Sequence, residues 1–185
     1  EIYQCDWSSD VCSSDLGASF ADPRATWESN AHIVVSLLDA VRLDSPETRF
    51  YQASSGEMFG SAPGASVVHD ERSALNPQSP YAAAKAAAHL LCRSYRESYD
   101  VRIACGILFN HESRRRGSRF LTRKVIDHLV ALHTGRAIGP LALGNLKVQR
   151  DWGFAPEYAD GMITILRQTQ VRGDDDIRSE EHTSE

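Results

Sequence analysis

The sequence predicts an α/β fold, in which a parallel sheet of Rossmann type carries helices on both faces. Helical and strand-like patterns alternate between residues 17 and 171. One strand-like run, "VRIACGILF" at 101–109, has Arg102 as its only charged residue, which is typical of a strand buried on both faces. Parallel strands need crossover connections, and such sheets bind ligands at the carboxyl ends of their strands.

The first half of the chain is expected to form a helix, a strand, a loop and a second helix. Apolar residues recur at helical spacing over 22–42, and the short strand-like run "TRFYQASS" follows at 48–55. Residues 60–79 are rich in Pro, Gly and Ser, which favours a loop. Ser79 is then a suitable N-cap for an alanine-rich helix that runs to about Tyr99.

The second half continues the alternation after the buried strand. A charged loop at 110–119 leads into an amphipathic helix at 120–135, which Gly135 closes. The run "GPLALGN" at 139–145 is predicted as a short strand, and 155–169 as the last helix.

Composition excludes several classes of protein. The 185 residues carry a net charge of −5 and a pI of about 5.8, so there is no basic field for nucleic acid. No apolar run reaches the ~20 residues of a membrane span. No HExxH, CxxC or paired CxxH spacing indicates a metal site or a disulfide scaffold. Cys92 and Cys105 lie in apolar runs, and Cys5 and Cys12 in a polar leader. We expect a reduced, cytoplasmic protein without a metal.

The two ends of the chain, 1–16 and 172–185, are left out of the functional argument. Both are polar and neither shows a hydrophobic periodicity. The runs "DWSSDVCSSDL" and "RSEEHTSE" resemble translated sequencing-adaptor read-through, so foreign sequence is the favoured interpretation. Ordinary polar termini are the alternative.

The alanine-rich helix carries a tyrosine and a lysine four residues apart, Tyr81 and Lys85. Residues at this spacing share a helix face. A nearby ammonium favours the phenolate, and a phenolate in a cleft can take the proton of an alcohol while hydride leaves the carbon. The alternative is a surface pair that stabilises the helix by about 0.3 kcal/mol.

Polar residues follow both of the predicted strands. Ser55 and Glu57 follow the first, where a hydroxyl can bond a reacting oxygen and a carboxylate can act as a general base. Asn110 and His111 follow the second, in a loop whose arginines can recognise anions. Turn residues and solvated charges are the alternative interpretation. The other histidines are interpreted as structural or surface residues: His32, His69, His89, His128 and His133.

Four stretches together resemble one known family. They are "RFYQASSGEMFG", "NPQSPYAAAKAAAHLLCRSYRESY", "GILFNHESRRRGSRFLTRK" and "LALGNLKVQRDWGFAPEYADGM". The chain from about Ser19 to Gln168 is similar to the GDP-mannose 4,6-dehydratases, members of the extended short-chain dehydrogenase/reductase group, or NAD-dependent epimerase/dehydratase superfamily. The YxxxK spacing is shared by the whole group, whereas "NHES…RG" followed by "GNL…RDWG" is specific to this family.

The resemblance implies a lyase that turns GDP-mannose into GDP-4-keto-6-deoxymannose through an internal redox cycle on NADP. In that cycle Tyr81 deprotonates the 4-hydroxyl while hydride moves from C4 to NADP⁺. Glu57 removes the C5 proton and protonates the departing 6-hydroxyl, and hydride then returns to C6. Ser55, where the family usually has Thr, is expected to bond O4. Lys85 is expected to bond the nicotinamide ribose and to tune Tyr81.

The resemblance also assigns binding residues and an assembly. The implied cofactor contacts are Ser19, Tyr81, Lys85, His111 and Arg116. The implied substrate contacts are Asn110, Lys124 and Arg150. A homodimer or homotetramer is implied for the whole protein, with GDP-mannose as its substrate.

The chain departs from the family in two ways. Arg114 replaces a Pro of the family motif "NHESPRRG", which should loosen the loop but spare Arg116. The GxxGxxG turn that cradles the cofactor pyrophosphate is absent. Residues 17–135 are therefore expected to be a partial Rossmann-type domain without its N-terminal βαβ unit, and 136–171 the start of a substrate-binding part. The alternatives are a related nucleotide-sugar reductase or epimerase, or a catalytically inactive fragment; Glu57 favours the dehydratase, because only elimination needs a base for the C5 proton.

Overall fold

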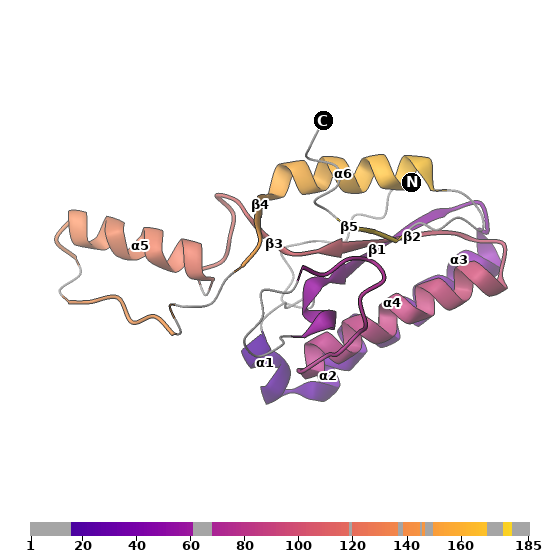
Figure 1. Ribbon diagram of the computed structural model, residues 1–185, viewed down its shortest axis with the longest axis horizontal. Coiled ribbons are helices and arrows are strands. Elements are labelled where there is room, and N and C mark those ends of the chain that lie inside the picture. Colours follow the sequence, from indigo (N-terminus) through magenta and orange to yellow (C-terminus); the bar gives the residue numbers. More distant parts are fainter. Residues whose placement is uncertain are drawn as a thin grey trace. The chain divides into compact units, whose positions relative to one another are not determined.

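The computed structural model of the chain describes residues 16–60, 68–118, 120–136, 139–144, 146, 150–169 and 176–178 (Figure 1). The chain divides into two compact units. The first is formed by Glu1–Leu108 together with Gly161–Glu185, and the second by Phe109–Asp160. Each unit is described by itself.

The first unit begins with four helical segments: α1 (Leu16–Ala21), α2 (Pro23–Trp27), the π-helical η2 (Glu28–His32) and α3 (Ile33–Asp44). The N-cap of α2 is Asp22, whose carboxylate accepts a hydrogen bond from the Ala25 amide at 2.9 Å. The helix predicted over 22–42 is confirmed in outline. The π-helical turn within it is a difference, because apolar spacing does not distinguish a single wide turn from a regular one.

The sheet of this unit has three described strands: β1 (Arg49–Ser55), β2 (Arg102–Leu108) and β5 (Asp176–Arg178). Their order is β1-β2-β5, and both pairings are parallel, so the predicted parallel sheet is confirmed. All residues of β2 after Arg102 are buried, as the apolar run predicts. The strand β5 lies in the polar end of the chain, where the sequence predicts no strand.

The helix α4 (Pro80–Ser98) follows β1 along the chain and packs against both β1 and β2. The Ser79 hydroxyl accepts a hydrogen bond from the Ala82 amide at 3.0 Å, which confirms the predicted N-cap. Figure 1 shows α3 and α4 side by side on one face of the sheet. The core between these helices and the sheet contains Val34, Leu38, Ala88, Cys92, Val101, Ile103 and Cys105.

The second unit contains a two-stranded parallel sheet, in which β3 (Asn110–Glu112) pairs with β4 (Trp152–Phe154). The helix α5 (Leu121–His133) lies between these strands in the sequence, and α6 (Ala155–Gln168) begins directly after β4. Gly135, with φ 67°, follows α5 as predicted.

Two expectations for this unit are wrong. The strand predicted at 139–145 is absent from the described residues 139–144, because Gly139 has φ 128°, outside the strand region, and Pro140 has no N–H to pair. The loop predicted at 110–119 begins instead with β3, whose three residues are extended because β4 pairs with them. Such short strands depend on a partner and have no pattern of their own.

Candidate active site

Ser55 and Glu57 stand on a tight turn at the carboxyl end of β1. Ser55 is the last residue of β1 and the N-cap of the 3-10 helix η3 (Gly56–Phe59), where its Oγ accepts a hydrogen bond from the Glu57 amide at 3.3 Å. Ser55 is buried and Glu57 is half-buried. The turn therefore places a hydroxyl and a carboxylate two residues apart at the edge of the sheet where ligands bind.

The turn is fastened on its far side by a neighbouring loop. Met58 and Phe59 are buried, and the Met58 carbonyl accepts a hydrogen bond from the Asn76 amide at 2.8 Å. The turn ends at Gly60, with φ 68° and ψ −165°, and a Cβ there would lie 2.3 Å from the Asn76 carbonyl oxygen. Sequence reasoning missed Gly60 as part of the site. The signal was available, because a glycine closing "SSGEMFG" suggests a backbone that other residues cannot adopt.

Tyr81 and Lys85 come from the first two turns of α4. Tyr81 is 7% exposed, and the Lys85 ammonium lies 5.8 Å from the centre of its ring. Lys85 Nζ also donates a hydrogen bond to the Ala53 carbonyl of β1 at 3.2 Å. The lysine thus reaches across from the helix to the strand that ends in Ser55. This arrangement puts a positive charge beside the ring of a buried phenol.

Ser19 lies in α1, which packs against α4. It is buried, and its hydroxyl donates a hydrogen bond to the Leu16 carbonyl of its own helix at 2.7 Å. The oxygen keeps its lone pairs as acceptors. Its implied contact with the cofactor stays a prediction.

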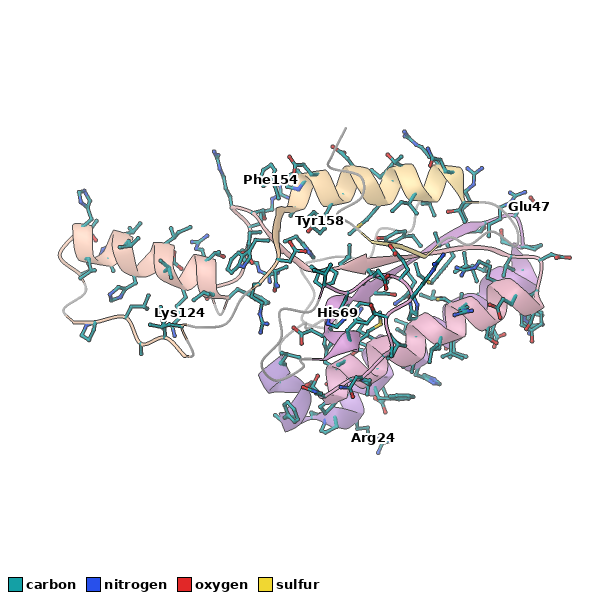
Figure 2. The ribbon with its side chains drawn as sticks, in the orientation of Figure 1. Arg24, Glu47, His69, Lys124, Phe154 and Tyr158 are labelled. Carbon is teal, nitrogen blue, oxygen red and sulfur yellow. The ribbon has the colours of Figure 1, made fainter. Side chains whose placement is uncertain are left out.

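In the second unit, His111 is held from two directions. Its Nδ1–H donates a hydrogen bond to the Phe109 carbonyl at 3.0 Å, and its ring lies 5.2 Å from the ring of Tyr158. Tyr158, marked in Figure 2 near the start of α6, is buried and covers Gly153 so closely that a Cβ there would lie 2.1 Å from the ring. The bonded Nδ1 leaves Nε2 as the acceptor of the neutral ring.

Arg116 is fixed by a carboxylate and an aromatic ring. Its Nε lies 3.2 Å from Oε1 of Glu112, and its guanidinium carbon lies 3.5 Å from the centre of the Phe120 ring. The other carboxylate oxygen of Glu112 accepts a hydrogen bond from the Thr122 hydroxyl. A flat guanidinium held in this way is suited to recognise phosphate oxygens.

The remaining predicted residues of this unit are more open. Lys124, labelled in Figure 2, is exposed, and its ammonium donates a hydrogen bond to the Ala142 carbonyl at 2.8 Å. Arg150 is exposed and Asn110 is half-buried. The common role of these three residues in holding a substrate stays a prediction.

The structure therefore groups the predicted residues in two sets, one in each unit. The first set consists of Ser19 in α1, Ser55 and Glu57 at the end of β1, and Tyr81 and Lys85 in α4. The predicted residues from 110 onward belong to the second unit. Within the described residues, no cluster of His, Cys, Asp and Glu could hold a metal ion. In the same residues, no helix is long and apolar enough to cross a membrane.

Comparison with known proteins finds a family model described as GDP-mannose 4,6 dehydratase, which matches residues 11–184. The chain is 45% identical over 159 residues to GDP-mannose 4,6 dehydratase 2 of Arabidopsis thaliana, which covers 84% of this chain and 42% of the relative. It is 41% identical over 157 residues to GDP-mannose 4,6-dehydratase of Sinorhizobium fredii, which covers 84% and 44%. The chain thus spans about two fifths of the length of these relatives.

Solved structures share the fold at lower identity. RMD from Pseudomonas aeruginosa complexed with NADPH superposes with a TM-score of 0.81 at 22% identity, over 90% of this chain and 55% of that protein. The dTDP-glucose 4,6-dehydratase DesIV from Streptomyces venezuelae, solved with NAD, gives a TM-score of 0.77 at 24% identity, over 90% and 49%. These likenesses establish a mixed α/β fold with parallel strands.

Proposed function

The chain belongs to the GDP-mannose 4,6-dehydratase family, and from this premise we propose that its protein converts GDP-mannose to GDP-4-keto-6-deoxymannose with NADP. The chemistry that bound NADP supplies is the removal of hydride from C4 and its return to C6. The chain's own residues supply binding and proton transfer. The single observation that carries the proposal is the Lys85 ammonium, which approaches the Tyr81 ring and bonds the strand that leads to Ser55 and Glu57.

Tyr81 acts as the base for the 4-hydroxyl. The Lys85 ammonium, 5.8 Å from the ring centre, favours the phenolate, which takes the proton of the 4-hydroxyl. Ser55 supplies the hydrogen bond to O4. Its Oγ accepts from the Glu57 amide, so its own hydroxyl hydrogen is available to donate to a sugar oxygen.

Glu57 serves the elimination step. A ketone at C4 acidifies the C5–H bond, and the Glu57 carboxylate takes that proton. The same group then protonates the departing 6-hydroxyl, so that water leaves and the carboxylate is restored. Because Glu57 is half-buried and two residues from Ser55, one short turn brings the second base to the same sugar ring.

The polar groups of this chain fit an anionic dinucleotide. Lys85 suits a ribose hydroxyl, and the stacked guanidinium of Arg116 suits a phosphate oxygen. Nε2 of the neutral His111 ring suits a hydrogen-bond donor, such as a ribose hydroxyl or an amide N–H. Two neighbours of this fold were solved with NADPH and with NAD, which supports a nicotinamide dinucleotide as the cofactor. NADP over NAD, contacts from Ser19, and substrate contacts from Asn110, Lys124 and Arg150 are parts of the proposal. So is assembly as a homodimer or homotetramer.

The experiment that tests the proposal separates the two bases in the full-length gene product that carries this chain. With Glu57→Gln, the first hydride transfer should proceed while elimination stops, so absorbance at the NADPH wavelength should rise after one addition of GDP-mannose and stay high. With Tyr81→Phe, the same absorbance should not rise, and turnover should fall about 10³-fold, the usual scale for loss of a general base.

The controls decide between this function and its relatives. Unchanged protein should release the keto sugar without net NADPH. Normal dehydration by the Glu57→Gln variant would remove Glu57 from the mechanism. A protein that interconverts C4 epimers or only reduces a keto sugar would instead be an epimerase or reductase of the same superfamily.

A further inference from the structure

A buried polar pair lies in the contact between α4 and the sheet. His89 Nδ1 and Ser54 Oγ are joined by a hydrogen bond of 2.9 Å, and the two side chains are 7% and 3% exposed. The same imidazole interacts with the thiol of Cys105 on β2. One side chain of α4 therefore contacts both β1 and its neighbour β2.

The position of this pair in the sequence links it to the reactive residues. His89 follows Lys85 by four residues, as Lys85 follows Tyr81, so the three share one face of α4. On the strand, Ser54 directly precedes Ser55, the residue that caps the turn bearing Glu57. The hydrogen bond thus joins the element that carries one base to the element that carries the other.

The first half of α4 offers few large side chains that would fix its axial position on the sheet, whereas Arg96, near its end, donates a buried hydrogen bond to the Ile103 carbonyl of β2 at 3.2 Å. The buried residues of α4 that precede His89 are alanines, apart from Tyr81: Ala82, Ala84, Ala86 and Ala88. Alanine methyl groups allow close packing but resist sliding of the helix only weakly. Large side chains insert between residues of the facing element and so define one axial position. The polar contacts that join α4 to β1 include that of Lys85 with the Ala53 carbonyl and that of His89 with Ser54.

In the proposed reaction the Lys85 ammonium also binds the cofactor and tunes Tyr81, so its hydrogen bond to the Ala53 carbonyl competes with these interactions. The contact of His89 with Ser54 has no such competing role. We propose that His89 is a positioning residue, which through Ser54 fixes α4 on β1 and so sets the distance between Tyr81 and the Ser55–Glu57 turn. This inference rests on the proposed function for its kinetic part and on geometry alone for its structural part.

The expected effect on rate follows from how strongly catalysis depends on the positions of the reacting groups. Catalytic groups generally need to stay within ~0.5 Å of the productive geometry, and a displacement of 1 Å can lower the rate ~100-fold. Removing the pair should therefore lower kcat roughly 10- to 100-fold, and KM for GDP-mannose less than about threefold.

The test uses the full-length gene product with His89→Phe, Ser54→Ala, the double variant and His89→Asn. Asparagine can offer a polar atom near the place of Nδ1, so His89→Asn should recover most of the rate lost in His89→Phe. The double variant should be no slower than the slower single variant, because the two residues act as one unit. Cys92→Ala is the matched control: it empties space in the same helix–sheet core and should lower stability without changing kcat per folded molecule.

Crystal structures of the unchanged protein and of His89→Phe supply a readout that does not need turnover. The distance from Tyr81 Oη to Ser55 Oγ should differ between them by more than about 0.5 Å. An unchanged distance, or kcat per folded molecule equal to that of the unchanged protein, would overturn the positioning role. If the unchanged protein does not dehydrate GDP-mannose, the proposed function fails, and the same distance still decides the inference.

Discussion

Replacing Gly60 by alanine is the substitution whose cost can best be worked out from the structure. Gly60 ends the turn that carries Glu57, and its amide donates to the Glu57 carbonyl at 3.1 Å. Alanine there meets two obstacles. The backbone at φ 68° and ψ −165° is one that side-chain-bearing residues rarely adopt, and the new Cβ would stand 2.3 Å from the Asn76 carbonyl oxygen.

The two obstacles are of similar size. Holding an L residue in this backbone region costs about 2 kcal/mol. The oxygen that the Cβ meets belongs to the main chain, so relief requires the loop at Asn76 to move, which strains the bond from its amide to Met58; such a bond contributes about 1 kcal/mol. We expect Gly60→Ala to lower the free energy of unfolding by about 3 kcal/mol.

Gly135→Ala is the matched comparison. Gly135 has φ 67°, almost the same as Gly60, but a Cβ there would have no atom within 4 Å. It should cost only the strain of a left-handed residue, about 1 kcal/mol. Urea denaturation of the chain with each substitution measures both losses against the unchanged chain. A loss of only about 2 kcal/mol at Gly60, the share of its backbone strain, would show that the contact with Asn76 does not hold the turn.

Three further expectations follow from single contacts. Gly153→Ala should push Tyr158 away from His111 and weaken NADP binding to the full-length gene product by up to about tenfold. This factor corresponds to the loss of an aromatic contact of about 1.4 kcal/mol. Titration calorimetry measures the affinity, and an unchanged value would show that His111 does not contact the cofactor. Contact with Cys92 and burial raise the pKa of the Cys105 thiol, so its share of stability is full below about pH 9 and falls as pH rises further; Cys105→Ala should flatten that fall in urea midpoints measured from pH 7 to 10. The 185-residue chain alone should bind NADP very weakly and show no dehydration, because no GxxGxxG turn is present to hold the pyrophosphate; micromolar affinity by calorimetry would contradict this.

The parts of the fold that the sequence predicts are those whose signal is local. The run from Val101 to Phe109 contains β2 because seven neighbouring apolar positions need burial on both faces. The start of α4 is predictable because a serine before a proline and a run of alanines caps a helix wherever it lies. These elements follow from the chain itself, before any distant contact forms.

The parts that the sequence does not predict depend on partners. β3 and β4 are three residues each, and each is a strand only because the other pairs with it. The run at 139–145 has the apolar residues of a strand, but Gly139 adopts a backbone conformation that no strand allows. The π-helical turn η2 likewise leaves no trace in apolar spacing. In each case a long-range pairing or a single backbone angle decides the structure.

The candidate site shows the same division within one helix. The spacing of Tyr81, Lys85 and His89 places all three on one face, and chemistry then singles out the first two, because a phenol beside an ammonium has an evident use. His89 alone suggests no reaction step, so the sequence analysis interprets it as a structural or surface residue. Its hydrogen bond to Ser54 shows what that structural role is, because it joins α4 to β1. Had α4 carried Leu or Phe in place of its alanines, large side chains would fix the helix on the sheet and His89 could be replaced at little cost. In α4, which has alanines at those positions, the buried contacts of His89 with Ser54 and of Arg96 with the Ile103 carbonyl join the helix to the sheet.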